Sequence, residues 1–581
     1  MKTTLSSYRT ILLTYLRPQQ GRVLLLTLLL SLSIGLQLVN PQIVRQFIDA
    51  AQGGAPQRTL INGALLFLGV ALLGQVVYTA LSYLTVAVGW TATNALREDL
   101  MAHCLQLDLS FHSAHLPGEM IERIDGDVTL LANFFARFVI RLLGGGLLLL
   151  GALGLTVRED WRLGLLLIGF AIIMLTATKM LQQVGVPYLK RWRQTVTDQL
   201  GFWEERLGGI EDIRSNGAID YIMQQHYHLN RAALRAMRQA FIMARIVVHT
   251  WEVLDAGGRA ALFVLAAYLL NLGVLSLGSA YLVFYYTGLF SDNLGWIAEQ
   301  LEDLQRAAAG IERLNELYQT TRTLVDGVHT LSNRAPPAIT FQAVTFGYTE
   351  TQTVLNHISF HLAPGQVLGL LGRTGSGKTT LTRLLFRFYD PKAGAIYLDG
   401  VDIRQLKVST LRQQIGFVTQ DVQLFHATVR DNLTFFNANI ADEQILQAIS
   451  ELGLQAWFSA LPAGLETQLG PGGTGLSGGE AQLLAMTRLL LRQPSVIVLD
   501  EASARLDPAT ERLLDTAISR LLQKRTAIII AHRLATVARA DQLLILDHGQ
   551  IVEHGSYAQL ANDPHSHFST LLQIGATEVL A

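Results

Sequence analysis

The hydrophobic pattern divides the chain near residue 300. Before that point, six stretches are apolar over about the 20 residues that a helix needs to cross a bilayer. We place these predicted spans at 22–43, 59–84, 136–157, 161–182, 247–270 and 276–298. From about residue 338, apolar strand-like runs alternate with helical ones, which predicts a mainly parallel sheet covered by helices. The pattern therefore predicts a multidomain protein: an all-α polytopic membrane domain followed by an α/β domain.

The connections between the predicted spans alternate in length. Those after the first, third and fifth spans are short, whereas those after the second and fourth, roughly 85–135 and 183–246, are long and polar. With a cytoplasmic N-terminus, both long connections and the C-terminal half face the cytoplasm. Basic residues then lie on the side that the positive-inside rule requires: Arg22, Arg97, Arg123, Lys190, Arg191, Arg193 and Arg214.

Both long connections have helical rather than loop-like patterns. The stretches 96–109 and 191–207 have amphipathic spacing with few helix breakers, so we expect the spans to continue as helices into the cytosol. A short polar turn interrupts each connection, at 110–118 and at 208–218. We expect these turns to contact the soluble domain; the alternative is a surface loop without a partner.

Composition narrows the function classes. Half of the 581 residues are hydrophobic and 16% are charged, against about a quarter charged in a typical soluble domain. The net charge of −1 argues against a polyanion-binding protein, so we expect no nucleic-acid partner. One cysteine, Cys104, excludes a disulfide framework or a thiolate metal cluster. We expect a membrane domain at 1–319, a linker at 320–337 and a soluble domain at 338–581.

Ionisable and amide side chains gather within three of the predicted spans. Because an unpaired charge inside a bilayer costs a few kcal/mol, these side chains must face a cavity or one another. Two interpretations stay open: a substrate cavity, or ion pairs that lock helices together, with Arg259 bound to Glu252 or Asp255. The residues are His249, Glu252, Asp255 and Arg259 on one helical face, Asp292 and Asn293 in the sixth span, and Arg137 and Arg141 in the third.

A phosphate-binding loop lies in the second half of the chain. The apolar run 366–371 predicts a strand and 381–388 a helix, and the segment between them matches G-x-x-x-x-G-K-[ST]. Glycines let backbone N–H groups turn toward phosphates, Lys378 adds a point charge, and the Thr379 hydroxyl can ligate Mg²⁺. The loop reads Gly372, Arg373, Thr374, Gly375, Ser376, Gly377, Lys378 and Thr379, followed by Thr380.

Two carboxylates follow a second predicted strand. The run 496–499 is apolar and ends at Asp500 and Glu501. A carboxylate at a strand end beside a phosphate loop can hold Mg²⁺, and the next one can polarise an attacking water. We therefore expect Asp500 to be a metal ligand and Glu501 to be the catalytic base.

Five residues about a hundred positions after Lys378 resemble the signature motif of ATP-binding cassette (ABC) proteins: Leu476, Ser477, Gly478, Gly479 and Glu480. The resemblance covers about 338–573 and implies further roles, with ATP and Mg²⁺ as cofactors. Tyr348 resembles the aromatic residue that stacks on adenine, and Gln420 the glutamine that senses Mg²⁺ and water. Asp507 resembles the acidic residue of the dimer-facing loop, and His532 the histidine that contacts the γ-phosphate.

The six-span plan resembles the exporter branch of the same family. Residues 117–121 with Asp127 are similar to its first cytoplasmic extension, and 209–211 to its second. The resemblance implies a half-transporter that dimerises with a second subunit, identical or not, so that Ser477 of one chain faces the ATP held by Lys378 of the other. It further implies a bacterial plasma membrane and export of a small amphipathic, lipid-like, drug-like or peptide substrate. The alternative function is an ATP-gated or regulatory membrane protein without net pumping.

The chain departs from the family pattern at two positions. Pro471 stands where a glutamate commonly precedes the signature, and that glutamate relays contact between motor and membrane domains. Arg505 stands in the dimer-facing loop where a small residue is commoner. Neither departure removes a group needed for hydrolysis, but the first concerns how the two domains are coupled.

Overall fold

The computed structural model describes residues 13–331, 335–420, 422–470, 472, 476–500, 508–531 and 537–574, with the side chains of 297–305 and of a few residues in 134–139 and at 182 excepted. The chain divides into two compact units. The helical unit comprises Met1–Leu105 and Pro117–Thr320, and the α/β unit comprises Gln106–Leu116 and Thr321–Ala581. Most of the first predicted cytosolic turn therefore belongs to the α/β unit.

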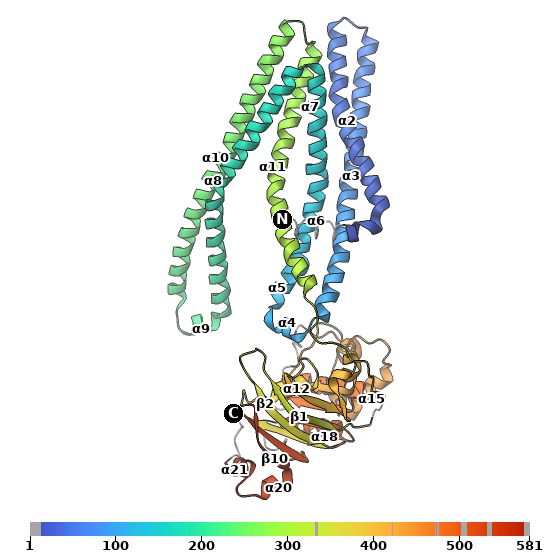
Figure 1. The fold of residues 1–581 in the computed structure, drawn as a ribbon, viewed down its shortest axis with the longest axis vertical. Helices are drawn as coiled ribbons and strands as arrows, with labels where there is room; N and C mark the ends of the chain where they lie inside the picture. The colour runs from blue at the N-terminus through green and yellow to red at the C-terminus, as the bar shows by residue number, and fades with distance from the viewer. Residues whose placement is uncertain are drawn as a thin grey trace. The chain divides into compact units, whose positions relative to one another are not determined.

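Long helices build the helical unit (Figure 1). At 1.5 Å per residue, a helix of about 50 residues is roughly 75 Å long, far more than a bilayer needs. The helical extension of the second and fourth spans is thus confirmed, since α3 and α8 have 50 and 48 residues. The main helices are α2 (Gln20–Gln52), α3 (Gln57–Gln106), α7 (Gly145–Glu159), α8 (Trp161–Gly208), α10 (Ile219–Asn271) and α11 (Leu277–Gln319), and the short 3₁₀-helix η1 (Arg17–Gln19) precedes α2.

Five helices in the described part of the chain are long and apolar enough to cross a membrane. The sixth predicted span lies in α11, which is long enough but less apolar because it carries Tyr281, Tyr285, Asp292 and Asn293. Helix α11 nevertheless buries Leu282, Val283, Tyr286 and Phe290. The Tyr286 hydroxyl donates to the Leu38 carbonyl at 2.7 Å, so this tyrosine joins α11 to α2 as a packing residue.

The third predicted span is a helix with π-helical turns. It consists of α6 (Val128–Arg137), the π-helix η3 (Phe138–Gly144) and α7, and a second π-helix, η2 (Glu122–Asp127), precedes α6. A π turn contains one residue more than an α turn, which the 3.6-residue pattern does not reveal. Single π turns of this kind are frequent at functional sites.

The two cytosolic turns are short helices. The first turn contains α4 (Leu109–Ala114) and is followed by α5 (Pro117–Ile121). The second contains α9 (Ile210–Ser215), which joins the antiparallel helices α8 and α10 (Figure 1).

Two sheets form the α/β unit. The larger has the order β10-β9-β3-β8-β7-β6, parallel except for β10, which confirms the mainly parallel sheet. The smaller is antiparallel, with the order β2-β1-β4-β5, and the sequence pattern did not separate it from the first. The strands are β1 (Ile339–Phe346), β2 (Leu355–Leu362), β3 (Val367–Gly372), β4 (Ala393–Leu398), β5 (Val401–Asp402), β6 (Ile415–Val418), β7 (Val496–Asp500), β8 (Thr526–Ile530), β9 (Gln542–Asp547) and β10 (Gln550–Ser556).

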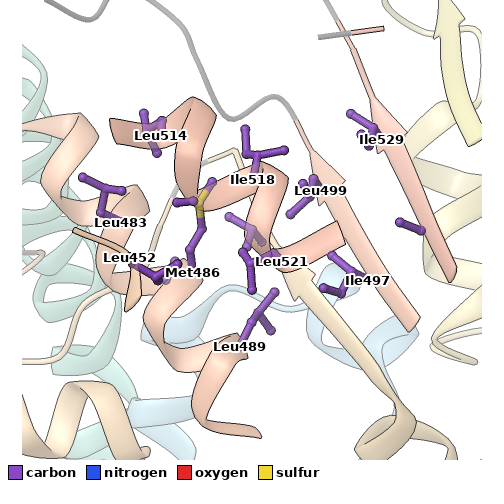
Figure 2. Packing of buried hydrophobic residues seen from close by; sticks show 14 of the residues in the cluster. Leu452, Leu483, Met486, Leu489, Ile497, Leu499, Leu514, Ile518, Leu521 and Ile529 are labelled. Carbon is purple, nitrogen blue, oxygen red and sulfur yellow. The ribbon is translucent and has the colours of Figure 1, made fainter. Parts of the chain in front are cut away.

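Helices cover the larger sheet and complete its core. Figure 2 shows Met486 and Leu489 of one helix and Ile518 of another packed together with Ile497 and Leu499 of β7. Strands β3, β7 and β8 are almost fully buried, as expected for a parallel sheet covered on its faces. The helices are α12 (Lys378–Leu385), α13 (Val408–Gln414), α14 (Val429–Thr434), α15 (Asp442–Glu451), α16 (Gln455–Ser459), α17 (Gly478–Arg492), α18 (Pro508–Leu522), α20 (Tyr557–Asn562) and α21 (His567–Ile574), with the short 3₁₀-helices η4 (Ile403–Gln405) and η5 (Gly464–Glu466).

Candidate functional site: a nucleotide site in the α/β unit and charged helices in the helical unit

The phosphate loop joins the end of β3 to the start of α12, as predicted. Three of its glycines have positive φ: 148° at Gly372, 84° at Gly375 and 107° at Gly377. At Gly372 a Cβ would lie 2.2 Å from the Leu546 carbonyl oxygen, and at Gly377 it would lie 2.6 Å from Leu355. Only glycine combines this backbone with such close packing, so these positions fix the loop conformation.

Lys378 is buried at the first position of α12. Its Nζ donates to the carbonyl oxygens of Gly372 at 2.6 Å and of Arg373 at 3.0 Å, which holds the ammonium inside the loop. The Ser376 hydroxyl is buried and has no hydrogen-bond partner among the residues that the structure describes. Because a buried polar atom costs free energy until it is satisfied, a phosphate oxygen fits this position. The Thr379 side chain is exposed, so its hydroxyl is accessible to a ligand.

Tyr348 presents its ring next to the same loop. Its hydroxyl lies 3.1 Å from the Thr380 hydroxyl and accepts a hydrogen bond from Arg383 at 3.2 Å. The rings of Phe346 and Tyr389 pack edge-on against it at 5.2 and 5.3 Å. The side chain remains 45% exposed, so it is fixed in place and still able to stack on a base.

Strand register places the predicted metal ligands at one edge of the sheet. Leu370 of β3 and Asp500 of β7 are both in register with Ile530 of β8. Since adjacent strands lie about 4.8 Å apart, Asp500 is about 10 Å across the sheet from β3, at the edge where the phosphate loop begins. Gln420 follows β6, which is the neighbour of β7. Glu501, Asp507 and His532 lie outside the described residues, as do Pro471 and Arg505.

The signature segment forms the start of α17. Ser477 caps the helix: its hydroxyl accepts from the Glu480 N–H, and the Glu480 carboxylate accepts from the Ser477 N–H at 2.7 Å. This reciprocal cap fixes the first turn, in which Gly478 and Gly479 are the first two residues. The first N–H groups of a helix have no acceptor within it, so this end is suited to bind an anion.

Arg488 is a functional candidate that the sequence analysis missed. It lies on α17 and donates to the carbonyl oxygens of Asn432 at 2.6 Å and Gln423 at 2.9 Å. Burial lowers the pKa of its guanidinium to about 10. The side chain therefore ties the signature helix to the segment that follows Gln420. The sequence feature that could have indicated this role is the position of Arg488 within the apolar run 483–491.

Comparisons with known proteins agree with this geometry. The family model described as "ABC transporter transmembrane region" matches residues 23–293, and the one described as "ABC transporter" matches 355–504. The uncharacterized ABC transporter ATP-binding protein YknV of Bacillus subtilis (strain 168) is 30% identical over 563 residues, which cover 94% of this chain and 91% of the relative. The chain belongs to the ABC transporter family.

Other similar proteins are exporters or flippases. An ATP-dependent lipid A-core flippase of Pseudomonas fluorescens is 29% identical over 587 residues, covering 98% of this chain and 96% of that one. The structure of a bacterial Atm1-family ABC exporter with ATP bound aligns with a TM-score of 0.81 and 25% identity, covering 96% and 99% of the two chains. This chain is therefore an integral membrane half-transporter of the exporter type that binds and hydrolyses ATP.

The charged residues of the transporter's spans divide into pairs. Arg259 lies 2.8 Å from Asp255 and 3.8 Å from Asp292, which matches the ion-pair interpretation with Asp255 as the partner. His249 and Glu252 pair with each other at 2.9 Å and are well exposed. Arg141 and Asn293 lie elsewhere, where both line a second pocket. The Arg137 side chain is outside the described part of the structure.

An apolar pocket of ≈ 580 Å³ lies beside Arg259. It is formed mainly by α10 and α11, and Ile48 of α2 also lines it. Arg259 is the charged residue among its lining residues, which are otherwise almost all apolar: Ile48, Leu262, Phe263, Ala266, Ala267, Leu270, Leu277, Ala280, Tyr281, Val283, Phe284 and Thr287. Arg259 is therefore ion-paired and also borders this pocket.

The first cytosolic turn of the transporter forms hydrogen bonds within the α/β unit. The buried Asp108 carboxylate accepts hydrogen bonds from the Thr323 hydroxyl at 2.8 Å, from the Thr323 N–H and from the Leu324 N–H at 3.3 Å. Ser113 of α4 lies 3.4 Å from the Tyr389 hydroxyl. The hydrogen bonds of Asp108 attach the turn to the beginning of the linker.

Proposed function

We propose that this half-transporter dimerises with a second half-transporter subunit and exports an amphipathic molecule that is lipid-like, drug-like or a peptide. The observation that carries the proposal is the pocket beside Arg259. Its volume of ≈ 580 Å³ lies in the range of small-molecule sites, and its lining combines an extended apolar surface with one ion-paired guanidinium. That combination fits a molecule with a large apolar part and a polar end.

The proposed nucleotide chemistry uses the phosphate loop and the neighbouring sheet edge. Lys378 would bind the terminal phosphates, while Thr379, Asp500 and Gln420 would hold Mg²⁺ directly or through water. Mg²⁺ supplies charge neutralisation at the phosphates. Glu501 would polarise the attacking water and His532 would steady the γ-phosphate, with Tyr348 stacking on adenine.

Two chains are required for a complete ATP site in this proposal. The anion-binding end of α17 carries Ser477, Gly478, Gly479 and Glu480. It would face the ATP that is held by the phosphate loop of the other subunit. The residue of the other subunit that is equivalent to Asp507 would lie beside it, in the dimer-facing loop. ATP would then join the two subunits, and hydrolysis would release them. The partner is either a second copy or a related subunit.

We place the transporter in a bacterial plasma membrane with its N-terminus and ATPase unit in the cytoplasm. The basic residues of the two long extensions, such as Arg97 and Arg214, support this orientation. The relatives named as lipid A-core flippases support a lipid-like substrate. Membrane lipids are the surroundings of the helical unit in either case.

The first test identifies the cargo and then blocks the pocket. Mass spectrometry of the transporter purified in native lipid reports the bound molecule and any second subunit. Ala267→Trp fills the pocket from α10, and Ala261→Trp places the same bulk on an exposed position of α10 that does not line it. We expect the first variant to lower cargo-stimulated ATP hydrolysis about tenfold, the size of a lost apolar pocket contact, and the second to leave it unchanged.

Two further results decide the class of function. Arg259→Ala should change cargo-stimulated ATPase more than basal ATPase, and Glu501→Gln should nearly abolish turnover while ATP binding persists. Equal effects of the two tryptophan variants would contradict the pocket assignment. ATP-dependent ion conductance in liposomes without movement of the cargo would favour the gated alternative.

A further inference from the structure

Helix α12 presents two side chains to the hydroxyl of Tyr348. Thr380 and Arg383 are three positions apart on this helix, so they lie on the same face. The Thr380 hydroxyl lies 3.1 Å from the Tyr348 hydroxyl, and Nη1 of Arg383 donates to the Tyr348 hydroxyl at 3.2 Å. The helix that begins at the phosphate loop therefore also holds the far end of the Tyr348 side chain.

Two other aromatic rings restrict the plane of the Tyr348 ring. Phe346 and Tyr389 pack against it at interplanar angles of 85° and 83°. Near-perpendicular contacts of this kind are a preferred arrangement of aromatic pairs. Although the Tyr348 side chain is 45% exposed, its orientation is therefore set by two rings and by the two contacts at its hydroxyl.

Arg383 differs from other arginines of the α/β unit in its partner. Arg404 is paired with Asp402, and Arg430 with Asp442. In the part of the chain that the structure describes, no carboxylate lies within ion-pair distance of Arg383, and its guanidinium donates to Tyr348. An ion pair therefore does not explain the position of this arginine, whereas the contact with the tyrosine does.

Arg383 lies too far along α12 to share the role of Lys378. The two residues are five positions apart, which corresponds to about 7.5 Å along the helix axis and a rotation of about 140° around it. Lys378 lies inside the phosphate loop, whereas Arg383 lies at the ring that would meet the base. The helix thus separates a residue for the phosphates from a residue on the base side of the site.

Ordering the ring before the nucleotide arrives favours binding. An exposed side chain that becomes immobilised only when the ligand binds lowers the affinity by about three- to tenfold. Contacts that order the side chain in advance remove this loss. The contact from Arg383 is suited to this task, because a hydrogen bond from a charged donor is stronger than one between neutral groups.

We propose that Arg383 is a positioning residue for nucleotide binding, which holds the Tyr348 ring in the orientation that stacks on the base and does not itself touch the nucleotide. The inference rests on the proposed stacking of Tyr348 on adenine and adds a residue that acts through Tyr348. The sequence analysis did not single out Arg383, because its partner lies 35 positions away.

The KM for ATP and the kcat of the full-length transporter in nanodiscs test the proposal. Arg383→Met keeps an unbranched side chain and removes the donor. It should raise the KM by about three- to tenfold and leave kcat unchanged, because only binding is weakened. Arg383→Lys, which keeps a charged donor, should restore part of the affinity. An unchanged KM with a lower Tm would overturn the proposal, because Arg383 would then only stabilise the fold.

A double-mutant cycle shows whether Arg383 acts through the tyrosine hydroxyl. Tyr348→Phe removes this hydroxyl and should raise the KM by a factor similar to that of Arg383→Met. In the Tyr348→Phe background, Arg383→Met should have no further effect. A full additional loss in that background would overturn the proposal, because Arg383 would then act on the nucleotide by another route.

Two competitors of ATP separate positioning from direct contact. Inorganic tripolyphosphate has no base, so it should inhibit wild type and Arg383→Met equally; weaker inhibition of the variant would overturn the proposal, because Arg383 would then bind phosphates. Stacking tolerates any base, so GTP should be weakened by the same factor as ATP. A different factor for GTP would also overturn the proposal, because arginine would then read the edge of the base.

Arg404→Met is the matched control. It removes a guanidinium from the same unit, but one that is bonded to Asp402. We expect its KM for ATP to equal that of the wild type. Equal increases in KM for Arg383→Met and Arg404→Met would contradict the proposal, since a general loss of positive charge would explain both.

Tyr348→Ala separates this inference from the proposed nucleotide chemistry. If Tyr348→Ala raises the KM for ATP and Arg383→Met does not, the stacking of Tyr348 stands and this inference fails. If Tyr348→Ala leaves the KM unchanged, the stacking assignment fails and this inference fails with it, while the proposed export is unaffected. Increases in both variants, without additivity in the cycle, support both.

Discussion

The two cytosolic turns of the transporter are held in different ways. The first, with α4, belongs to the α/β unit, where Asp108 accepts three hydrogen bonds from the linker at Thr323 and Leu324. The second, with α9, belongs to the helical unit. Ile210 of this turn is 45% exposed, and Ile219 at the start of α10 is 53% exposed. One turn is therefore attached within its own chain, while the other presents an uncovered apolar surface.

The linker explains why the first turn is attached so firmly. The Val325 carbonyl accepts a hydrogen bond from the buried Arg387 at 2.7 Å, and the Asp326 carboxylate accepts from the Val408 N–H at 2.7 Å. His329 then forms a parallel bridge with Leu406. The linker is thus part of the α/β unit, and the first turn is connected to that unit through Asp108.

The second turn indicates an interaction surface. A pocket of ≈ 530 Å³ lies between its flanking helices, lined by aromatic and aliphatic side chains such as Trp203, Ile213 and Met223. Exposed apolar surface of this kind marks a contact with another molecule. In a half-transporter that dimerises, we expect the second subunit to cover it. The first turn would then make contacts within its own chain, and the second turn would make contacts with the partner subunit.

The largest expected effect on stability is at Arg387, which holds the linker to which the first turn is attached. Arg387 is 2% exposed and donates to Val325, to two further carbonyls and to Asp390. Arg387→Ala should lower the free energy of unfolding of the α/β unit by about 3–5 kcal/mol, because buried acceptors lose their partner. Denaturant unfolding of the full chain measures this. Arg404→Ala, which breaks an exposed pair with Asp402, should cost about 1 kcal/mol or less. Similar losses in both variants would show that the linker is not anchored as described.

An intermediate effect is expected at Asp108. Asp108→Ala removes a charged acceptor worth about 1.5–3 kcal/mol, so the attached turn should become roughly ten- to a hundredfold less populated. We expect cargo transport to fall by about tenfold while the Kd for ATP is unchanged. Asp108→Asn should restore part of the transport, since its amide oxygen still accepts. The matched control is Asp125→Ala, which removes an exposed carboxylate paired with Arg97. Unchanged transport in Asp108→Ala would mean that the first turn is attached but not used for coupling.

The smallest effect on stability is expected at the second turn. Ile210→Asp adds a charge to an exposed position, so the free energy of unfolding should change by about 0.5 kcal/mol or less. The dimer, measured by mass photometry, should nevertheless weaken, and the ATPase rate at low protein concentration should fall several-fold. Glu211→Gln on the same short helix should leave both unchanged. A dimer unaffected by Ile210→Asp would remove the proposed contact of α9 with the partner.

The elements that the sequence predicted correctly depend on local patterns. The phosphate loop was predicted because Gly372, Gly377 and Lys378 occur at a fixed spacing that only one backbone path satisfies. The pairing of Arg259 with Asp255 was among the alternatives considered, because residues four apart meet on a helix. The long helices were predicted because their apolar and polar faces repeat without a break over many turns.

Features that depend on distant contacts were not predicted. Asp108 was not singled out from the sequence, because its partners Thr323 and Leu324 lie more than 200 positions away. The same applies to the stacking of Arg141 on Trp296 and to the anchoring role of Arg488. The antiparallel sheet was missed because the alternation of apolar and polar residues in β1, β2 and β4 identifies a strand but not the strand with which it pairs.

The π-helical turns change which residues of the third span share a helix face. Each π turn holds one surplus residue without interrupting the helix, so the side chains before it are rotated by about 100° from the positions an unbroken α-helix would give them. A helix face that is assigned at a constant period of 3.6 residues is therefore wrong on one side of Phe138–Gly144. A deletion of one residue in that segment would wind it into regular α-helix. This deletion removes a single residue, yet it would turn Arg141 to another side of the helix bundle.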